Sequence, residues 1–406
     1  MHSTPKAYDV IIIGAGIFGL TLAYELKKRF FSLSILILEK ESHLGAHASG
    51  RNSGVLHAGI YYPKGSLKAK FCKSGREQMT EFCHEHEIPV FNCGKIIVAT
   101  KPSDQPQLDL IKDRADENQV PVEVLSEKDL KELEPLAFTH ERFLYSPTTS
   151  VVDPKPVLET LESVLNQKGV QIKKGEEVLI VNPHEKTLLT QSGTYSYGHL
   201  VNAAGSFSDK IAHQMGVGLD YRLIPFKGIY ALLNPEFSQK IRHCVYPVPD
   251  LRYPFLGVHL TLTPNRSVKV GPTAIPAFGR ENYEKLTGFS ARDIWTAMRP
   301  LMGGYFKNQD GLRNLIHEEL KNYYFPHYVK SAQKLIPSLQ AADFKSRFYK
   351  SGIRAQLVDL KKQKLLMDFK IEKGPDSTHL LNAVSPGWTS SFAFAQYLVD
   401  EFLLLN

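Results

Sequence analysis

The sequence predicts an α/β protein in which a domain built on a parallel sheet is interleaved with an α+β domain built on a mainly antiparallel sheet. Three observations support this prediction. Two apolar runs and the helical repeat between them form one βαβ unit that ends at Glu39. From Tyr221 to Thr273 the pattern changes to extended runs with prolines and alternating apolar and polar residues. No low-complexity linker separates the two patterns, which indicates domains that alternate along the chain.

The elements of the first unit follow from their spacing. Val10–Ile13 is a continuous β-branched run, as buried parallel strands are. From Ile17 to Lys28 the apolar residues recur at helical spacing, and the basic residues at the end suit a helix C-terminus. Ser34 to Leu38 is the second strand. A parallel sheet is therefore expected at the start of the chain.

The later elements are expected in the same way. Residues 122–135 predict a strand and a helix capped by Ser126, with Asp129 where a full capping box carries Glu or Gln. Residues 154–181 predict a helix and two strands, and residues 195–205 another buried strand. Helical patterns extend to about Leu339, and a closing helix is expected from Ser391 to Leu405. We assign residues 1–85, 146–220 and 341–406 to the first domain, and 86–145 and 221–340 to the second.

Composition narrows the class of protein. A chain of 406 residues with 43% hydrophobic and 22% charged residues is typical of a globular protein with two or three domains. The net charge of +7 is not gathered into a basic run, which argues against nucleic acid as a partner. This mild positive charge is compatible with a small anionic substrate and with peripheral contact at an anionic membrane surface.

Cysteine usage and the apolar segments indicate a compartment. The four cysteines form no CxxC pair, which indicates reduced thiols and neither a zinc site nor a disulfide framework. No secretory leader precedes the first strand, and the most apolar stretch is too short to span a bilayer. We therefore expect a cytoplasmic protein whose membrane contact, if any, is peripheral on the inner face.

The glycines of GAGIFG fit the G-x-G-x-x-G pattern of a Rossmann-like dinucleotide-binding domain. The three glycines, Gly14, Gly16 and Gly19, serve a tight turn, close backbone approach to a pyrophosphate, and packing of the helix on the strand. The helix N-terminus that follows favours an anion. Glu39, at the end of the second strand, can accept hydrogen bonds from a ribose. In this context a bound dinucleotide is expected, and the alternative is a glycine turn without a ligand.

The motif alone leaves NAD and FAD open, and the residues after Glu39 decide between them. The stretch from His47 to Pro63 is small, polar and rich in glycine, so it is poorly suited to the next strand of an NAD domain. Its backbone N–H groups can surround the diphosphate and ring system of a flavin, since few side chains intrude. The sequence therefore favours a segment that binds FAD. The alternative is a flexible surface loop without a ligand.

Longer strings carry a family resemblance. HASGRNSGVLHAGIYYPKGSLKAKFC, CGKIIVA, YPVPDLRYPFLGVHLT, GPTAIPAF and GIRAQLVD, in this order, resemble the L-2-hydroxyglutarate dehydrogenase/oxidase family, within the D-amino-acid-oxidase-like superfamily of flavoproteins. The resemblance runs nearly end to end. It implies FAD, a two-domain fold, and oxidation of a 2-hydroxy acid, first L-2-hydroxyglutarate, to the 2-oxo acid by hydride transfer to flavin N5. Electrons would pass on to oxygen or to a quinone-linked acceptor.

The resemblance also implies a set of FAD contacts. Residues at the glycine turn, along the stretch after Glu39, at two strand ends and at the start of the last helix would touch the cofactor: Gly14, Gly16, Gly19, Glu39, Lys40, Ser49, Asn52, Ser53, Gly54, Val178, Ala204, Gly205, Gly387, Trp388, Thr389 and Ser390. The N–H groups at the start of that helix would face the flavin pyrimidine, where electron density rises on reduction.

Oxidation of a 2-hydroxy acid requires a cation for the carboxylate, a base for the hydroxyl proton and a Cα hydrogen aimed at flavin N5. Arg354 in GIRAQ resembles the superfamily's carboxylate-binding arginine, whose fork matches a carboxylate. His57 and His259 both lie on matching motifs, and imidazole titrates near neutral pH. The choice between them stays open, with His259 slightly favoured by the alternation along its strand.

Further residues are candidates for binding the rest of the substrate. Lys227 and Arg252 are candidates for a distal carboxylate, and Tyr62 is a candidate for a hydrogen bond to the substrate. Surface charge and packing are the alternatives for these residues. The HEHE cluster at residues 84–87 lacks the spacing of a metal site, so no metal is expected.

The chain departs from the family pattern at four places: PFKG for PFRG, SPTTSVVD for SPHTGIVD, NAVSPGWTSS for NAPSPAATSS, and KKQKLL after GIRAQLVD. These changes leave the cofactor and fold intact, but they put the substrate in doubt, because pocket volume and charge lie near them. An amine or amino-acid oxidase is one alternative. A flavin-binding assembly protein with weak catalysis is another.

Overall fold

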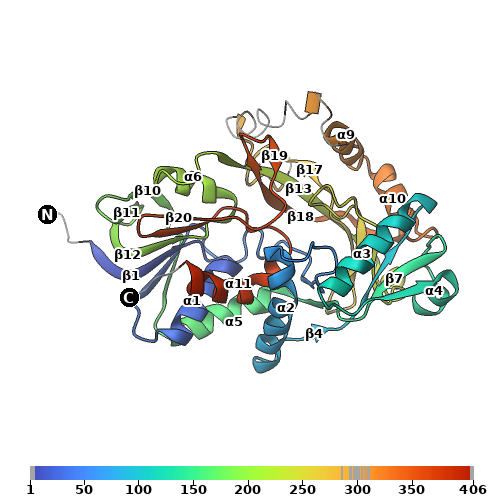
Figure 1. Cartoon of the computed structure of the whole chain (residues 1–406), viewed down its shortest axis with the longest axis horizontal. Coiled ribbons are helices and arrows are strands. Elements are labelled where there is room, and N and C mark those ends of the chain that lie inside the picture. Colours follow the sequence, from blue (N-terminus) through green and yellow to red (C-terminus); the bar gives the residue numbers. More distant parts are fainter. Residues whose placement is uncertain are drawn as a thin grey trace.

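The computed structural model describes residues 5–284, 287–291 and 311–402, together with positions 295, 302, 305, 306 and 308. Two large sheets lie side by side along the long axis of the molecule (Figure 1). One sheet is parallel at its centre, and the other is mainly antiparallel. The expected fold class is therefore confirmed.

The first sheet has the strand order β10-β11-β12-β1-β2-β9, and β21 and β20 extend it from β12. β1 pairs in parallel with both β2 and β12, while β10 and β11 form an antiparallel edge. The strands are β1 (Lys6–Ile13), β2 (Ile35–Glu39), β9 (Gln171–Lys174), β10 (Val178–Asn182), β11 (Thr187–Thr190), β12 (Thr194–Asn202), β20 (Ile371–Gly374) and β21 (Ser377–Leu380).

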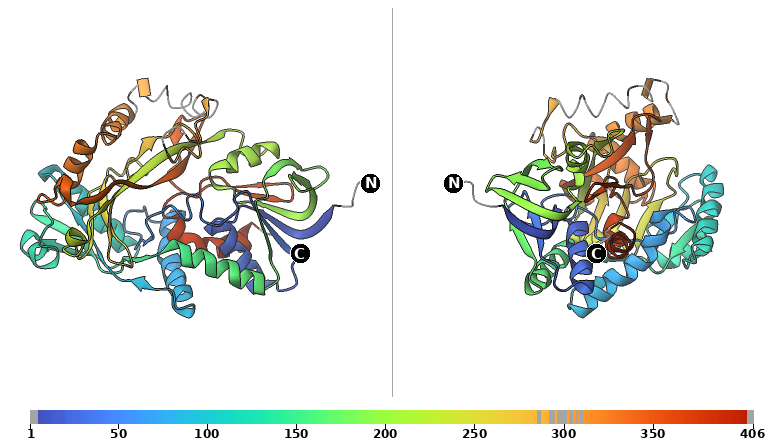
Figure 2. Two further views of the ribbon diagram at one scale, coloured as in Figure 1. Left: turned by 180° about the vertical axis from the view of Figure 1, so that it is seen from behind. Right: turned by 60° about the vertical axis from the view of Figure 1, so that its left-hand side comes forward.

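Both faces of this sheet are covered. Helices α1 (Ile17–Arg29), α2 (Leu67–Glu85), α5 (Pro154–Gln167) and α11 (Gly387–Glu401) pack together on one face, and α6 (Ser208–Gln214) packs on the other (Figure 1 and Figure 2). Along β1, Val10 and Ile12 pack in the hydrophobic cluster beneath α1, α2, α5 and α11. Ile11 and Ile13 pack in the cluster beneath α6. This alternation explains why the strand is a continuous apolar run: each face needs its own apolar side chains.

The second sheet is centred on two long strands, β13 (Tyr221–Leu233) and β18 (Phe344–Asp359), which pair antiparallel along most of their lengths. The strand order is β19-β18-β13-β16-β15-β14-β5-β7-β6, with β17 beside β13. The pairing of β5 with β14 is parallel. The other strands are β5 (Lys95–Val98), β6 (Glu123–Ser126), β7 (Arg142–Ser146), β14 (Cys244–Pro247), β15 (His259–Leu262), β16 (Val268–Gly271), β17 (Ile275–Pro276) and β19 (Lys364–Leu365).

Shorter elements complete the described fold. A small sheet of β3 (Val55–Leu56), β8 (Ser150–Val152) and β4 (Val90–Phe91) connects the two halves. The helices around the second sheet are α3 (Gln105–Glu117), α4 (Glu127–Leu133), α7 (Pro235–Ser238), α9 (Leu312–Lys321) and α10 (Phe325–Gln333). Short 3-10 helices cover Pro102–Asp104, Gly205–Phe207 and Ala341–Asp343.

Three details differ from the expectations. β18 and β19 pair in the second sheet, so strand pairing moves the last boundary between the two halves from residue 341 to a point after Leu365. The closing helix begins at Gly387 and not at Ser391, because the four residues from Gly387 to Ser390 already have helical geometry. The capping box at Ser126 is complete, since the Asp129 carboxylate also accepts from the Ser126 N–H.

The four cysteines, Cys72, Cys83, Cys93 and Cys244, are buried free thiols. The Sγ atoms of Cys93 and Cys244 lie 3.5 Å apart, although the residues are far apart in the chain. The expected helix end at residues 84–87 is present, because α2 ends at Glu85 and most of this cluster is exposed. In the described part of the chain, no helix is long and apolar enough to cross a membrane.

Candidate active site

A cavity of about 510 Å³ is lined by residues from both sheets. Its volume lies within the usual range for cofactor and small-molecule sites. One end is formed by the loops that follow β1, β2 and β12 and by the segment before β10. The other end lies between the start of α11, the segment around His57 and the paired strands β13 and β18.

The glycine turn after β1 forms the first end of the cavity. Gly14 has φ +102°, and a Cβ there would lie 2.5 Å from the carbonyl oxygen of Ala203. A Cβ on Gly19 would lie 2.0 Å from the carbonyl oxygen of Gly14, so Gly19 serves helix packing and does not line the cavity. Gly16 caps α1 and has no side chain to bond the first turn, which also has no acidic residue. The N–H of Ile17 donates to Ser49, and the remaining N–H groups of this helix end can bind an anion.

Glu39 ends β2 beside this turn. Its two carboxylate oxygens accept hydrogen bonds from the N–H groups of Ala15 and Glu41, each at 3.0 Å. These contacts hold the carboxylate in place at the wall of the cavity. Val178, Ala204 and Gly205 line the same end.

The segment after Glu39 wraps the middle of the cavity. Ser49 accepts a hydrogen bond from the N–H of Ile17 at 2.9 Å, which ties this segment to the start of α1. Ser49, Asn52 and Ser53 line the cavity. Gly54 does not: it has φ +81°, and a Cβ there would lie 2.2 Å from the carbonyl oxygen of Val152. Gly54 is therefore a residue of the turn that supports the lining.

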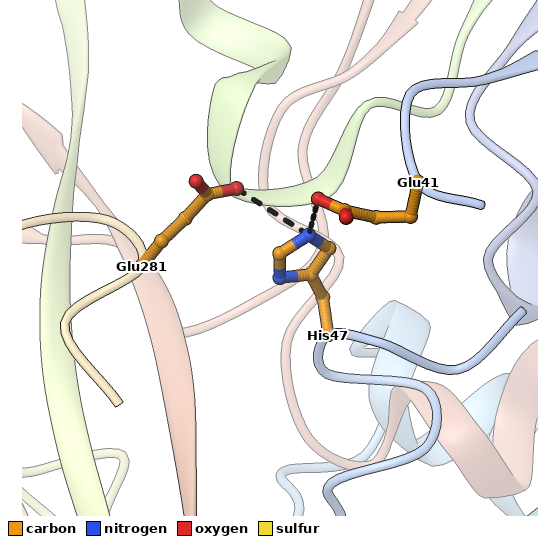
Figure 3. A group of neighbouring side chains, drawn as sticks. All are labelled: Glu41, His47 and Glu281. Atoms are coloured by element: carbon orange, nitrogen blue, oxygen red, sulfur yellow. Dashed lines mark hydrogen bonds and ion pairs between the residues drawn. The ribbon is translucent and has the colours of Figure 1, made fainter. Parts of the chain in front are cut away.

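Charged side chains close the outer edge of this end (Figure 3). His47 Nε2 lies 2.8 Å from Glu41 and 3.3 Å from Glu281, and its Nδ1 lies 2.7 Å from the hydroxyl of Tyr283. The ligand atoms of Glu41, His47 and Glu281 lie within 4.8 Å of one another, as in a cation site. However, the Lys40 ammonium pairs with Glu41 and lies 2.5 Å from Glu281. Because Lys40 already supplies the positive charge, we interpret the group as an ion-pair network.

The start of α11 faces the middle of the cavity with Gly387, Trp388 and Thr389. The Thr389 hydroxyl donates to the carbonyl of Val55 and accepts from the N–H of His57, both at 3.1 Å. The indole N–H of Trp388 is buried and has no hydrogen-bond partner within the described chain. Ser390 is buried away from the cavity, so its expected place beside the cofactor is not the one that the structure gives it.

Arg354 lies at the other end, on β18. Its partner on β13 is Phe226, and Gly352 pairs with Gly228 beside it. All four residues line the cavity. Within the described residues the guanidinium makes no hydrogen bond or ion pair, and its nearest recorded contact is the ring of Phe255 at 5.3 Å. Burial lowers its pKa from the usual value. A half-buried cation without a counter-ion at a cavity wall can bind an anion.

The structure separates the two candidate histidines. His57 lines the cavity, and its Nδ1 is buried without a partner. Burial, followed by the charges of Lys95, His259 and Arg354, holds its pKa well below the usual value, so the ring is neutral. His259 is 4% exposed, donates its Nδ1 proton to the Gly257 carbonyl at 2.8 Å and stacks on Tyr246. His57 therefore lines the cavity, whereas His259 does not.

Three further candidates are not on the cavity wall. Lys227 lies between Phe226 and Gly228, and neighbouring residues of a strand point to opposite faces, so its side chain points away from the cavity. Arg252 is 63% exposed and pairs with Asp250. Tyr62 is half-buried and lies within electrostatic reach of Arg354, but it does not line the cavity.

Sequence reasoning missed Tyr230 at the cavity wall, and it did not predict the burial of Lys95. Tyr230 lines the cavity from β13, two residues beyond Gly228, and burial raises its pKa to about 12. Lys95 starts β5 and is completely buried. The signal for Lys95 was present in the motif CGKIIVA, since a lysine that opens an apolar strand is either exposed at its edge or buried for a reason.

Comparison with known proteins identifies the class of enzyme. The profile of the DAO family of FAD-dependent oxidoreductases matches residues 9–401. This chain belongs to that family of enzymes, and its cofactor is FAD.

Individual relatives have more specific names than the family. The L-2-hydroxyglutarate dehydrogenase of Escherichia coli (strain K12) is 34% identical over 397 aligned positions, which cover 97% of this chain and 93% of the relative. The mitochondrial L-2-hydroxyglutarate dehydrogenase of Nematostella vectensis is 36% identical over 426 positions, 97% of this chain and 90% of the relative. That of Homo sapiens is 34% identical over 423 positions, 98% of this chain and 89% of the relative.

Solved structures share the fold at lower identity. The FAD-bound, dithionite-reduced L-α-glycerophosphate oxidase of Mycoplasma pneumoniae superposes with a TM-score of 0.75 at 22% identity, over 97% of this chain and 94% of that one. The glycine oxidase of Geobacillus kaustophilus gives 0.72 at 18% identity, over 97% and 94%. The two-sheet architecture is therefore common to oxidases of quite different small molecules.

Proposed function

We propose that this enzyme oxidises a 2-hydroxy acid to the 2-oxo acid, and that L-2-hydroxyglutarate is the substrate to test first. The single observation that carries the proposal is the half-buried guanidinium of Arg354, which faces the cavity without a counter-ion in the described chain. A carboxylate satisfies such a group in a bidentate manner. The relatives at 34–36% identity are L-2-hydroxyglutarate dehydrogenases, which supports the choice of hydroxy acid.

The cavity suits FAD along its whole length. The N-terminus of α1 would bind the diphosphate, Glu39 the ribose, and the segment around Val178 the adenine. The uncapped start of α11 and the unpartnered indole N–H of Trp388 would face the flavin ring. When bound, FAD supplies the hydride acceptor for the oxidation.

The residues of the chain would then divide the remaining work. Arg354 binds and orients the carboxylate of the hydroxy acid. His57, which is neutral because its pKa is lowered, accepts the proton of the hydroxyl group. Phe226, which lines the cavity and packs on Phe255, would exclude water from the site and so strengthen both polar contacts.

Anaerobic titration tests the proposal. L-2-hydroxyglutarate is added to the FAD-loaded enzyme without oxygen, and loss of the flavin absorbance band is followed, beside a panel of other 2-hydroxy acids, amino acids and amines. Reduction by hydroxy acids supports the proposal. Reduction by amino acids or amines alone would refute it, and an enzyme reduced by none would be a flavin-binding protein without this activity.

The electron acceptor is a separate part of the proposal. Oxygen and a quinone-linked acceptor are both compatible with a flavin. We favour an acceptor other than oxygen, since the relatives are named dehydrogenases. Turnover with a soluble quinone analogue, compared with oxygen uptake at the same substrate concentration, measures which of the two reoxidises the enzyme.

A further inference from the structure

Cys93 and Cys244 form a buried thiol pair outside the cavity. Their Sγ atoms lie 3.5 Å apart, within the range of a hydrogen bond between thiols, although the residues are 151 positions apart in the chain. Cys93 is 4% exposed and Cys244 is 0% exposed. Neither residue lines the cavity, so the proposed oxidation of a hydroxy acid does not use them. Two thiols in contact are, however, the reactants from which a disulfide forms.

The pair lies where two distant stretches of the chain join. The strands β5, β7 and β6 come from residues 95–146, whereas β13 to β17 come from residues 221–276. In the described strand order, the two stretches pair only through β5 and β14, which are parallel. Cys244 is the first residue of β14, and Cys93 lies two residues before β5. A covalent bond between the two sulfurs would therefore fasten this junction.

Lys95 makes Cys244 the more reactive sulfur of the pair. The two residues pair in register on β5 and β14, and paired residues of neighbouring strands point to the same face, so the ammonium lies beside the thiol. The Nζ of Lys95 has no hydrogen-bond partner in the described chain. The hydrogen bond from Cys93, and then the charge of Lys95, lower the pKa of Cys244 against the effect of burial. This favours the thiolate, which is the form that attacks peroxides.

The other two cysteines lack these features. Cys72 bonds to the carbonyl oxygen of His57 at 3.2 Å, and Cys83 lies on the buried face of α2. In the described chain, no second sulfur lies within hydrogen-bond distance of either thiol. Burial raises the pKa of both thiols to about 12, so they stay protonated. The four cysteines therefore comprise one reactive pair and two inert thiols.

We propose that Cys93 and Cys244 are a redox-sensitive dithiol, which hydrogen peroxide converts into a disulfide that fastens β5 to β14. The Cys244 sulfur attacks one oxygen of the peroxide, the O–O bond breaks, and a sulfenic acid and water are formed. The Cys93 sulfur then attacks the sulfenic sulfur, and a second water leaves. Two thiols and one peroxide thus give one disulfide and two waters, and two electrons pass from sulfur to oxygen.

The oxidant reaches this pair because it is small. Hydrogen peroxide is uncharged and close to water in size, so burial excludes it less than it excludes bulky disulfide oxidants. Cys93 follows the exposed Asn92, which places the pair next to the surface. A reduced flavin that reacts with oxygen produces hydrogen peroxide, so the enzyme contains a source of this oxidant.

Counting thiols in the FAD-loaded enzyme tests the dithiol. The enzyme is treated with hydrogen peroxide, and its thiols are then labelled with a maleimide during unfolding in acid, where exchange is slow because little thiolate is present. We expect the number of free thiols to fall from four to two, with the Cys93 and Cys244 peptides joined in the mass spectrum. Dithiothreitol should restore all four thiols.

Three variants identify the sulfurs. In Cys93→Ala, Cys244 should be oxidised only to the sulfenic acid, which dimedone traps, because the second thiol is absent. In Cys244→Ala no disulfide should form, and Cys93 should remain a thiol. Cys83→Ala removes a buried cysteine without a sulfur neighbour and is the matched control. It should form the Cys93–Cys244 disulfide at the unaltered rate.

Thermal unfolding measures the effect of the cross-link. A disulfide between residues far apart in the chain constrains the unfolded state, so we expect the oxidised enzyme to unfold about 5 °C above the reduced enzyme. Dithiothreitol should remove the difference, and Cys244→Ala should show none. If a cysteine variant does not fold, the oxidised and reduced forms of the unaltered enzyme decide without it.

Three results would overturn the proposal. Four free thiols after peroxide treatment would mean that the pair is inert. A disulfide that includes Cys72 or Cys83, or that joins two chains, would place the reaction elsewhere. A Cys93–Cys244 disulfide without a rise in the unfolding temperature would mean that the bond does not fasten the junction. None of these measurements uses a substrate, so failure of the proposed function leaves them unaffected.

Discussion

The two ends of the cavity differ in how their charges are paired. At the first end Glu39 holds two backbone N–H groups, Lys40 pairs with two carboxylates, and His47 bonds to Glu41. At the other end the cation of Arg354 has no ion pair within the described chain. The charged side chains of the first end are paired with one another, whereas the charge at the second end depends on what binds there.

This difference has a chemical meaning. A resident cofactor needs a preformed cradle, and backbone groups fixed by glycine turns provide one without unpaired charge. A substrate enters and leaves, so the groups that bind it stay unpaired between turnovers, at a cost in stability. Substitutions at the unpaired end should therefore change activity strongly, and those at the paired end should change FAD affinity moderately.

The largest effect is expected for Arg354→Met. We expect kcat/KM for L-2-hydroxyglutarate to fall about 1,000-fold, because the substrate carboxylate loses its partner in a buried site. The FAD content, measured from the absorbance spectrum, should not change. Lys345→Met, at an exposed position of the same strand, is the control. Loss of FAD from the Arg354 variant would contradict the division between the two ends.

His57→Gln should lower the rate of anaerobic flavin reduction about 100-fold, the usual contribution of a general base. A base acts in its neutral form, and the pKa of His57 lies well below 6.5. The rate of the unaltered enzyme should therefore stay constant from pH 7 down past 6.5 and decrease only at lower pH. A decrease centred at 6.5 or above, or a larger loss in His259→Gln, would assign the base elsewhere.

Glu39→Gln should weaken FAD binding about 10-fold, since one of two carboxylate acceptors is exchanged for an amide. The Kd is measured by adding FAD to apoprotein and following flavin fluorescence. The rate of flavin reduction in the loaded variant should be unchanged. Glu127→Gln, an exposed position at the start of α4, should leave the Kd as it is.

Trp388→Phe keeps an aromatic ring and removes the unpartnered N–H, and we expect it to weaken FAD binding about fivefold. The chain has two tryptophans, and Trp295 is 63% exposed. FAD should therefore quench tryptophan fluorescence more strongly in Trp295→Phe, which retains Trp388, than in Trp388→Phe. Equal quenching in both variants would place Trp388 away from the flavin.

The smallest effect is expected for Glu281→Gln in the ion-pair network of Figure 3. Lys40 and His47 keep their contacts with Glu41, and half-exposed ion pairs contribute little. The Kd for FAD should change by less than about 3-fold. A large change in this Kd would show that FAD binding at this edge depends on the charge of Glu281.

The two ends also differ in how well the sequence predicts them. The glycine turn, Glu39 and the segment around Ser49 are close in the chain, so local motifs predict that they lie together, and they meet at the cavity wall. Arg354 and His57 were identified because the motifs that contain them resemble those of a known enzyme family. Lys227 was misplaced because a shift of one residue along β13 reverses the direction of a side chain. Lys95 was missed because its burial depends on the pairing of β5 with β14 and β7.

By itself, the sequence determined the βαβ unit, the fold class and FAD, because strand periodicity and glycine turns act over short stretches of chain. Only the tertiary structure decided which polar groups lack partners. Whether a charge is paired depends on every residue that packs around it, and those residues come from distant strands and helices. Through those long-range contacts His57 lines the cavity and His259 does not, and Lys95 is buried without a hydrogen-bond partner in the described chain.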